Sequence, residues 1–511
     1  MATTYKAQKE DFVSNLRGGS ISEINYVTAV APAAVILWSA LQSRLSFFDP
    51  YTPLAFTVDV LLNTGAILLA VTLYSSNPLL LSTLLLSPAV LLIALLPRAK
   101  PAQTPRKPAQ NGTTPSPSTS PRKDPLPRKP FLTTYRGAML AVTNIAILAV
   151  DFRVFPRRFA KVETWGTSLM DLGVGSFVFS AGLVSARAAL KGSSSSSSAA
   201  SSLPSRLLAS TRHSLPLFVL GLARLLSVKN LDYAEHVSEY GVHWNFFFTL
   251  ALLPPAVSLL PPSLSSPTST ILPPLLLLAA YQLTLSFTPL TSYILTAPRG
   301  PDLLSQNREG LCSLAGYLCI FLSGRSVGCA ILPASPPPSP RRGDNAAHRS
   351  LRRTLLTTHR VPFLLAQHAL AAAALYALLA SPLTRRFSLT PSRRLANAPY
   401  VLWVHAFNAA QLAAFYFVDA AFFASSSSSS STTRDKSHES TMTRTPPVLA
   451  AFNNNGLAIF LLANLLTGGV NMGVRTLEAG RGAAVGVLVA YVAVLAGTAV
   501  GMERWGVGIR L

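Results

Sequence analysis

Residues Asp151–Gly166 read DFRVFPRRFAKVETWG and separate two apolar runs, 132–150 and 167–186, each long enough to cross a bilayer. The segment holds four cations and two carboxylates at a membrane boundary. Ionisable groups at such a boundary are costly unless they serve a function. Two interpretations are open for this segment: a solvated loop whose long cationic side chains snorkel to water, or a reaction site.

The composition predicts a polytopic membrane protein. Of the 511 residues, 50% are hydrophobic and 12% are charged. The apolar residues form long runs rather than periodic faces, which excludes a soluble multidomain protein. We expect an all-α fold, with a single membrane-embedded domain over residues 1–511 and no cleavable signal peptide. A span needs roughly 20 apolar residues, which predicts about thirteen transmembrane helices around a polar cavity, at 26–45, 55–73, 79–97, 132–151, 167–187, 214–229, 245–261, 270–290, 309–332, 361–381, 399–424, 447–470 and 483–503.

Four polar linkers, at 98–130, 188–213, 333–358 and 425–446, hold much of the positive charge of the chain. The formal net charge is +23, but these cations are spread over linkers rather than gathered on one folded face, so we expect no nucleic-acid partner. The linkers are too poor in apolar residues to bury a core, which predicts disorder.

The order of spans and linkers predicts the topology. The four linkers follow the third, fifth, ninth and eleventh spans, so all lie on one side of the membrane. Lys and Arg concentrate in cytoplasmic loops, so the linkers and the C-terminus are predicted to be cytosolic. The N-terminus and the segments 151–166, 230–243 and 298–309 then share the opposite face, where the four cations of 151–166 favour anion recognition. The loop 382–398 also places four arginines there, but it contains no acid and is the weaker candidate.

The N-terminal segment contains a helix start. Ser20 and Glu23 have capping-box spacing, in which the Ser side chain accepts the amide three residues on and the Glu side chain reaches back. This predicts a short amphipathic helix before the first span. In the second span, Asp59 and Asn63 lie one helical turn apart and are expected to satisfy each other inside the bundle.

The end of the fourth span predicts a site for proton transfer. Asn144 and Asp151 are two helical turns apart, so both should face the same cavity. Pro156 prevents a regular helix from continuing, and the turn is expected to bring Lys161 back towards Asp151. A carboxylate in such a site can accept a hydroxyl proton, and an ammonium nearby can stabilise an oxyanion.

The run Asp151–Asp171, DFRVFPRRFAKVETWGTSLMD, resembles the signature of the glycosylphosphatidylinositol (GPI) anchor inositol acyltransferases, called Gwt in fungi and PIG-W in mammals. Other blocks resemble the same family in the same order, so the similarity spans nearly the whole chain outside the linkers. These blocks are EDFV at 10–13, GGSISEIN at 18–25, NLDYAEHVSEYGVHWNFFF at 230–248, NREG at 307–310 and NNNGL at 453–457.

The resemblance implies an enzyme of the endoplasmic-reticulum membrane with a lumenal site. Members of this family transfer a fatty acyl chain, typically palmitoyl, from acyl-coenzyme A to the inositol ring of glucosaminyl-phosphatidylinositol. The proposed catalytic pair of the family matches Asp151, as the general base, and Lys161, as the assisting cation. Acyl-coenzyme A is then a co-substrate, with no metal or other cofactor, and the glycolipid and membrane lipid are the remaining expected partners.

Further polar residues are candidates for substrate contact. His243 is the alternative candidate for the base, although a structural hydrogen bond is the more common role for either histidine of its motif. Arg153, Arg157 and Arg158 are candidates for phosphate binding, and glycines of the fifth span, such as Gly173 and Gly182, could open an acyl-chain groove or only allow close helix packing. The other candidates for substrate binding are Arg136, Asn144, His236, Asn245, Asn307, Glu309 and Asn464.

A lipid transporter or flippase is the alternative function for a bundle with this many spans. Transporters usually carry internal repeats and broken helices at corresponding positions of two halves. Neither pattern is apparent in this sequence, which favours the acyltransferase.

Overall fold

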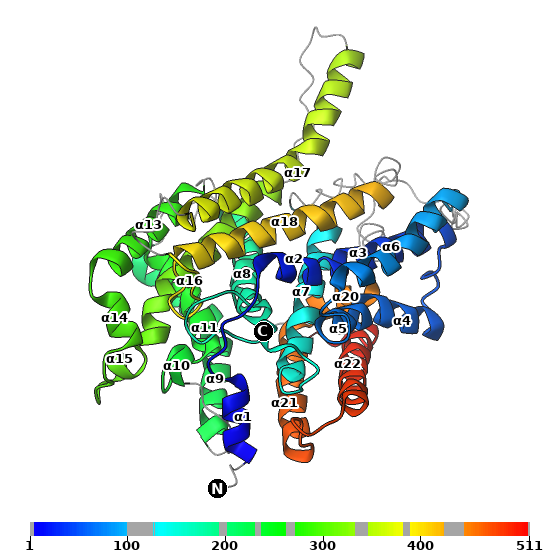
Figure 1. Cartoon of the computed structure of the whole chain (residues 1–511). Helices are drawn as coiled ribbons and strands as arrows, with labels where there is room; N and C mark the ends of the chain where they lie inside the picture. Colours follow the sequence, from blue (N-terminus) through cyan, green and yellow to red (C-terminus); the bar gives the residue numbers. More distant parts are fainter. Residues whose placement is uncertain are drawn as a thin grey trace, which may run out of the picture.

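The computed structural model describes residues 5–99, 126, 128–193, 202–229, 237–261, 271–332, 346–381, 389–423 and 444–508. These residues form a helical bundle, and within them the only β pairing is one isolated bridge between Gly18 and Thr167. The predicted all-α polytopic membrane fold is confirmed. In Figure 1, α7 and α8 lie in the middle of the bundle, with α3–α6 on one side and α13–α16 on the other.

The first half of the chain contributes the helices α1 (Tyr5–Val13), α2 (Ile21–Thr28), α3 (Val30–Leu45), α4 (Pro53–Val60), α5 (Ala66–Val71), α6 (Pro78–Leu95), α7 (Pro130–Ala149), α8 (Leu169–Ser193), α9 (Leu203–Lys229), α10 (Val237–Tyr240) and α11 (Phe246–Leu259). The second half contributes α13 (Leu272–Phe287), α14 (Leu290–Leu295), α15 (Leu303–Gln306), α16 (Arg308–Ile331), α17 (Ala346–Leu379), α18 (Ala398–Phe423), α20 (Pro447–Asn454), α21 (Gly456–Gly473) and α22 (Arg481–Arg504). Two short segments differ from α-helix, the π-helical η1 (Leu61–Gly65) and the 3-10 helix η2 (Arg157–Phe159).

All thirteen predicted spans fall on helices, but they are not equivalent. Within the described residues, ten helices are long and apolar enough to cross a membrane. The helices α11 and α13 are apolar but shorter, and α9 has 27 residues but carries four cations. The number of helices that cross the membrane therefore stays a prediction.

Two predicted spans contain interruptions. The twelfth divides at Asn455, where α20 ends and α21 begins. The second contains the π-helical turn η1, and its predicted polar pair is confirmed because Asn63 Nδ2 donates to Asp59 Oδ1 at 2.7 Å. Asp59 Oδ2 also accepts the backbone amide of Val448 at 3.0 Å, which fastens α4 to the start of α20.

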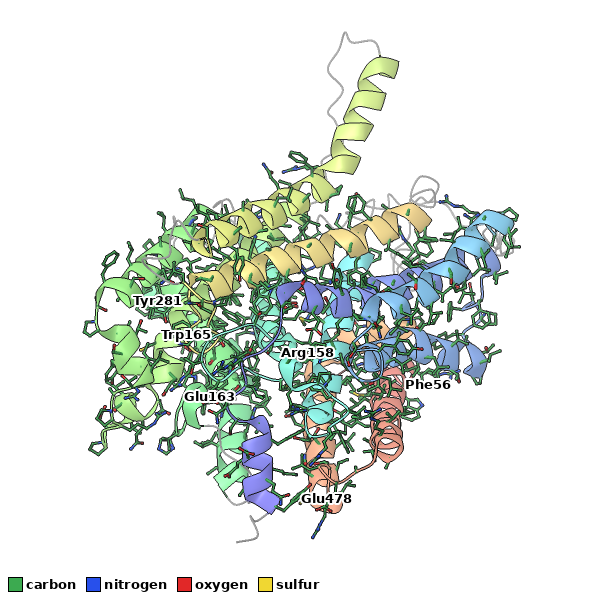
Figure 2. The ribbon with its side chains drawn as sticks, in the orientation of Figure 1. Phe56, Arg158, Glu163, Trp165, Tyr281 and Glu478 are labelled. Atoms are coloured by element: carbon green, nitrogen blue, oxygen red, sulfur yellow. The ribbon has the colours of Figure 1, made fainter. Side chains whose placement is uncertain are left out.

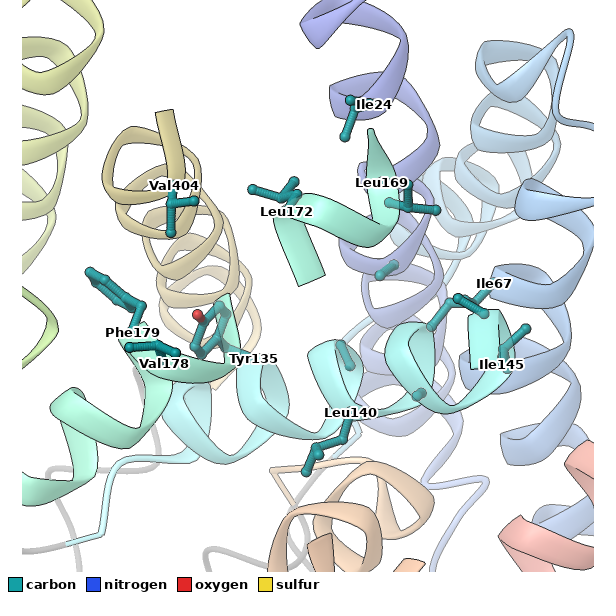
Figure 3. Packing of buried hydrophobic residues seen from close by; sticks show 14 of the residues in the cluster. Ile24, Ile67, Tyr135, Leu140, Ile145, Leu169, Leu172, Val178, Phe179 and Val404 are labelled. Carbon is teal, nitrogen blue, oxygen red and sulfur yellow. The ribbon is translucent and has the colours of Figure 1, made fainter. Parts of the chain in front are cut away.

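The core is formed where α7 and α8 meet their neighbours. Tyr135 and Ile145 of α7, and Leu172 and Phe179 of α8, are buried in one continuous cluster (Figure 3). Along α8, glycine permits close approach to α16: a Cβ on Gly182 would lie 2.0 Å from the carbonyl oxygen of Phe321. The close-packing role predicted as one alternative for these glycines is confirmed at this position.

Two linkers are shorter than predicted. Within 188–213, α8 continues to Ser193 and α9 begins at Leu203, and within 333–358 the helix α17 begins at Ala346. These helices extend beyond their apolar runs because flanking polar residues continue the turn, and composition alone does not reveal that boundary. Most of the linkers 98–130 and 425–446 lies outside the described residues.

The predicted helix before the first span is α2. Ser20 Oγ accepts the amide of Glu23 at 3.2 Å, as the capping box requires. The predicted return bond from the Glu23 side chain to the start of the helix is wrong, because the Glu23 carboxylate pairs with Arg158 instead. A further helix, α1, precedes α2 and was not predicted.

Candidate functional site

The charged loop is anchored by aromatic side chains that the sequence analysis did not use. After α7 ends, Phe152, Phe155 and Phe159 are all fully buried. They hold the loop against the bundle, while the charged residues between them remain at least partly accessible. In Figure 2, Arg158, Glu163 and Trp165 lie in the central part of the view. The loop is therefore a folded element rather than a solvated connector.

Asp151 lies half-buried just beyond α7 and has a defined partner. Its Oδ2 accepts a hydrogen bond from Asn471 Nδ2 of α21 at 2.7 Å. Burial raises the pKa of the Asp151 carboxyl, while the hydrogen bond from Asn471 and the charges of Lys9 and Arg157 oppose that rise. Within the described residues, Asp151 Oδ1 makes no hydrogen bond. One carboxylate oxygen is thus fixed and the other can accept a proton.

Lys161 has a different partner. Its Nζ lies 2.7 Å from Glu239 Oε1 in α10. Among the described residues no hydrogen bond or ion pair joins Lys161 to Asp151. The turn at Pro156 does not make the two predicted catalytic side chains a direct pair.

Glu239 belongs to a buried ionic network that the sequence analysis missed. Arg393 Nη2 lies 2.9 Å from Glu239 Oε1, and Arg393 Nε donates to Asp171 Oδ1 at 2.6 Å. Burial lowers the pKa of Arg393, but Glu239 and Asp171 outweigh it and raise that pKa above its ordinary value. The loop around Arg393 was ranked low because it contains no acid. Its acids come from α8 and α10 instead, a pairing that sequence spacing does not indicate.

Arg157 and Arg158 each have partners within the protein, although Arg157 Nε and Nη1 are buried and make no hydrogen bond among the described residues. Arg157 Nη2 donates to the carbonyls of Val150, Phe152 and Phe155 at 2.7, 3.2 and 2.9 Å, which closes the loop on itself. Burial lowers the pKa of Arg157 to about 10, although Asp151 opposes this. Arg158 Nε pairs with Glu23 Oε1 at 2.5 Å. Arg153 is exposed.

Glycines explain how the N-terminal segment meets the loop. Gly19 N donates to Thr167 O at 2.8 Å. Gly18 has φ +80°, and a Cβ there would lie 2.1 Å from Thr167 O. Gly166 has φ +135°, and a Cβ there would lie 2.3 Å from Arg17 O. Both positions combine a left-handed backbone with close approach, so only glycine fits.

Hydrogen bonds link the described part of the block 230–248 to the start of α16 and cap α11. The His243 ring contacts Gln306 Oε1 at 3.0 Å through Nε2, and its backbone amide donates to Asn307 Oδ1 at 2.8 Å. Asn245 caps α11 by accepting from Phe247 N at 3.0 Å. These contacts favour the structural role for His243, Asn245 and Asn307. His236 lies outside the described residues.

Glu309 is fully buried among arginines. Arg299 binds it in a bidentate manner, with N–O distances of 3.1 and 2.7 Å. Arg394 Nη2 adds a bond at 3.2 Å, and Arg308 Nε lies 3.8 Å away. This cluster joins the start of α16 to the segment 389–397, so Arg394 also finds its acid in another part of the chain.

The remaining candidates lie in the spans. Arg136 Nε donates to Ser180 Oγ at 3.1 Å, and Asn464 Nδ2 donates to Phe460 O of its own helix at 2.7 Å. Asn144 is fully buried, and neither polar atom of its side chain makes a hydrogen bond within the part of the chain that the structure describes. An unpartnered amide in this position is unusual and indicates a group that a bound molecule could satisfy.

An apolar pocket lies between α3, α7, α8 and α18. Its cavity volume is about 50 Å³, and it is lined by residues that include Met139, Gly173 and Phe415. A Cβ on Gly173 would meet only Thr143 Oγ1, at 3.8 Å. At this glycine the groove-opening alternative therefore fits the geometry. Within the described residues, no group of three or more His, Cys, Asp or Glu side chains could hold a metal ion.

Comparison with known proteins covers almost the whole chain. The GWT1 family model matches residues 5–502. A GPI-anchored wall transfer protein 1 from Gibberella zeae is 52% identical over 512 residues, which is 99% of each chain. The protein of that name from Emericella nidulans is 51% identical over 513 residues, 100% of each chain. The one from Yarrowia lipolytica is 40% identical over 518 residues, again 100% of each. The chain belongs to the GWT1 family.

Proposed function

We propose that this protein acts in GPI-anchor biosynthesis and transfers a fatty acyl chain, typically palmitoyl, from acyl-coenzyme A to an inositol hydroxyl of glucosaminyl-phosphatidylinositol. Membership of the GWT1 family supports the pathway. The observation that carries the chemistry is the half-buried Asp151, with Oδ2 fixed by Asn471 and Oδ1 making no hydrogen bond to any described residue. We place the protein in the endoplasmic-reticulum membrane, with Asp151 on the lumenal side.

Asp151 is the general base of the proposed reaction. Its carboxylate takes the proton of the inositol hydroxyl while that oxygen attacks the thioester carbonyl. The resulting tetrahedral oxyanion collapses, the carbon–sulfur bond breaks, and the thiolate of coenzyme A leaves and takes up a proton. Burial raises the pKa of Asp151, and a base is most effective when its pKa approaches the working pH.

Lys161 assists as the cation that stabilises the oxyanion. Its side chain is 39% exposed and forms an ion pair with Glu239. An ammonium has three donor hydrogens, so this ion pair leaves donors for a substrate oxygen. Glu239 would then position Lys161, and Arg393 would position Glu239.

The apolar pocket beside Gly173 is a candidate for contact with part of the acyl chain. It lies between α7 and α8, the two helices that flank the charged loop. Ligand pockets are mostly apolar with a few polar groups that fix orientation, and the polar groups of this pocket include Asn408 and Gln411. Arg153 is the candidate for phosphate contact that keeps an exposed side chain.

The proposal is tested by acyl transfer from labelled acyl-coenzyme A in microsomes. We expect Asp151→Asn and Lys161→Ala each to lower the rate by about 100-fold or more, since bases and oxyanion donors typically contribute this much. Glu478→Gln is a matched control. Its carboxylate is 55% exposed in a surface pair with Arg475 and lies at the lower edge of Figure 2, so its loss should leave the rate unchanged.

Two outcomes would contradict the proposal. Full activity of both variants at normal expression would remove the assigned chemistry. Wild-type membranes that move the glycolipid across the bilayer without acylating it would favour the transporter.

A further inference from the structure

One face of the helix α1 contacts the residues around Asp151. Tyr5, Lys9 and Phe12 follow i, i+4, i+7 spacing and so share that face. Tyr5 Oη accepts the amide of Leu477 at 3.2 Å, and the Phe12 ring lies 3.8 Å from the Arg157 guanidinium carbon. The contacts of Tyr5 and Phe12 lie at the two ends of α1, so Lys9, between them, is held in place.

Lys9 reaches Asp151 through one amide. Lys9 Nζ donates to Asn471 Oδ1 at 2.7 Å, and Asn471 Nδ2 donates to Asp151 Oδ2 at 2.7 Å. A second hydrogen bond from Nδ2, to Thr467 O at 3.0 Å, fixes the amide within α21. Since an ammonium only donates and a carboxylate only accepts, the partners determine which way the amide points.

We infer that Lys9 and Asn471 are positioning residues of the proposed reaction, which fix Asp151 through Oδ2 and leave Oδ1 for the substrate hydroxyl. This inference rests on the proposed function of Asp151. Hydrogen bonds in a chain polarise one another, so the Lys9 ammonium strengthens the bond that the amide donates to the carboxylate. The N-terminal helix is thereby part of the reaction centre.

The charges around Asp151 predict the direction of the pH effect. The groups that face it are Lys9 on α1, Arg157 in its own loop and Tyr491 on α22. Asn471 and Lys9 lower the pKa of Asp151 against the effect of burial. Removing either one raises that pKa further. The base is then protonated at a higher pH, and activity is lost earlier as the pH falls.

A purely structural contact between α1 and α21 predicts a different result. Loss of Lys9 would then reduce the amount of folded protein but would leave the shape of the pH profile unchanged. The ratio of activities at two pH values does not depend on how much protein is folded. It therefore separates positioning from docking even for a variant that folds poorly.

The experiment measures acyl transfer by the full-length protein in membranes from about pH 5 to about pH 8. In Lys9→Met and Asn471→Leu we expect the acidic limb of the profile to move up by about half a pH unit or more. Lys9→Arg keeps the charge and should retain the wild-type profile. Arg17→Met is the matched control, because Arg17 is exposed and its side chain pairs with none of the described residues.

The possible failures are distinguishable. An unchanged acidic limb in both Lys9→Met and Asn471→Leu, with Asp151→Asn inactive, would overturn the positioning role and leave the proposed function standing. Wild-type activity in Asp151→Asn would overturn the assignment of the base itself. A shift of the same size in Arg17→Met would assign the effect to net charge and also overturn the inference.

Discussion

Asn144, in the C-terminal part of α7, has a buried side-chain amide that makes no hydrogen bond among the described residues. A buried polar group of this kind costs about 1–3 kcal/mol, so a similar apolar side chain should be better tolerated by the fold. We expect Asn144→Leu to raise the free energy of unfolding by about 1 kcal/mol. If the amide binds substrate, the same change should lower acyl transfer by about five- to tenfold.

A higher free energy of unfolding together with a lower rate of acyl transfer would identify Asn144 as a substrate contact. Thermal melting of the purified protein in detergent reports the first, and initial rates in microsomes report the second. A higher melting temperature with an unchanged rate would show that the amide has no part in the reaction.

The sequence singled out a charged segment as the candidate site, but it did not indicate which residues its charged side chains contact. The cost of charge at a membrane boundary singled out the loop of Asp151 and Lys161. Their partners, Asn471 and Glu239, come from segments far along the chain. Local spacing carries no information about such pairs, because they depend on how the helices pack. The same reason explains why Arg393 was ranked low although it binds two acids.

At the scale of helices, the same substitution at two glycines of α8 should destabilise the protein to very different extents. A Cβ on Gly182 would lie 2.0 Å from Phe321 O, whereas one on Gly173 would have its nearest contact at 3.8 Å. We expect Gly182→Ala to force α8 away from α16 and cost about 1–3 kcal/mol or more. Gly173→Ala should stay within about 1 kcal/mol of wild type.

Heating the detergent-purified variants and measuring the folded fraction by size-exclusion chromatography tests this pair. Melting of Gly182→Ala at the wild-type temperature would contradict the close approach of α8 to α16 at this glycine. The same contradiction would follow if Gly173→Ala were the less stable of the two.

The helices themselves were largely predictable, because membrane spans are set by apolar length. Their interruptions were not. The break at Asn455 and the π-helical turn at Leu61–Gly65 lie at polar residues inside predicted spans, Asn453–Asn455 and Asn63–Thr64, over which an apolar window averages. The extension of α17 to Ala346 lies in a polar segment. Length and composition are averages over a window, and they do not register local changes in the hydrogen-bond pattern.

At the scale of the whole molecule, four segments predicted to share one face are in contact. The N-terminal segment meets the loop through Glu23 and Arg158, the loop meets α10 through Lys161 and Glu239, and Val242 N donates to Gln306 O at 3.0 Å. These contacts confirm that the segments lie together. Which side of the membrane they face stays a prediction, and it decides where the substrate must be delivered.

Glycosylation mapping tests that orientation with two acceptor sites. The native Asn111-Gly-Thr sequence lies in the first linker, which is predicted to be cytosolic, and should remain unmodified. Arg17→Ser creates an Asn-X-Ser acceptor at Asn15, an exposed residue of the N-terminal segment predicted to be lumenal. We expect an endoglycosidase-sensitive band shift in Arg17→Ser that disappears in the double variant with Asn15→Gln. A shift in the wild-type protein that disappears with Asn111→Gln would invert the topology. Asp151 would then face the cytosol, where acyl-coenzyme A would reach it without crossing the membrane.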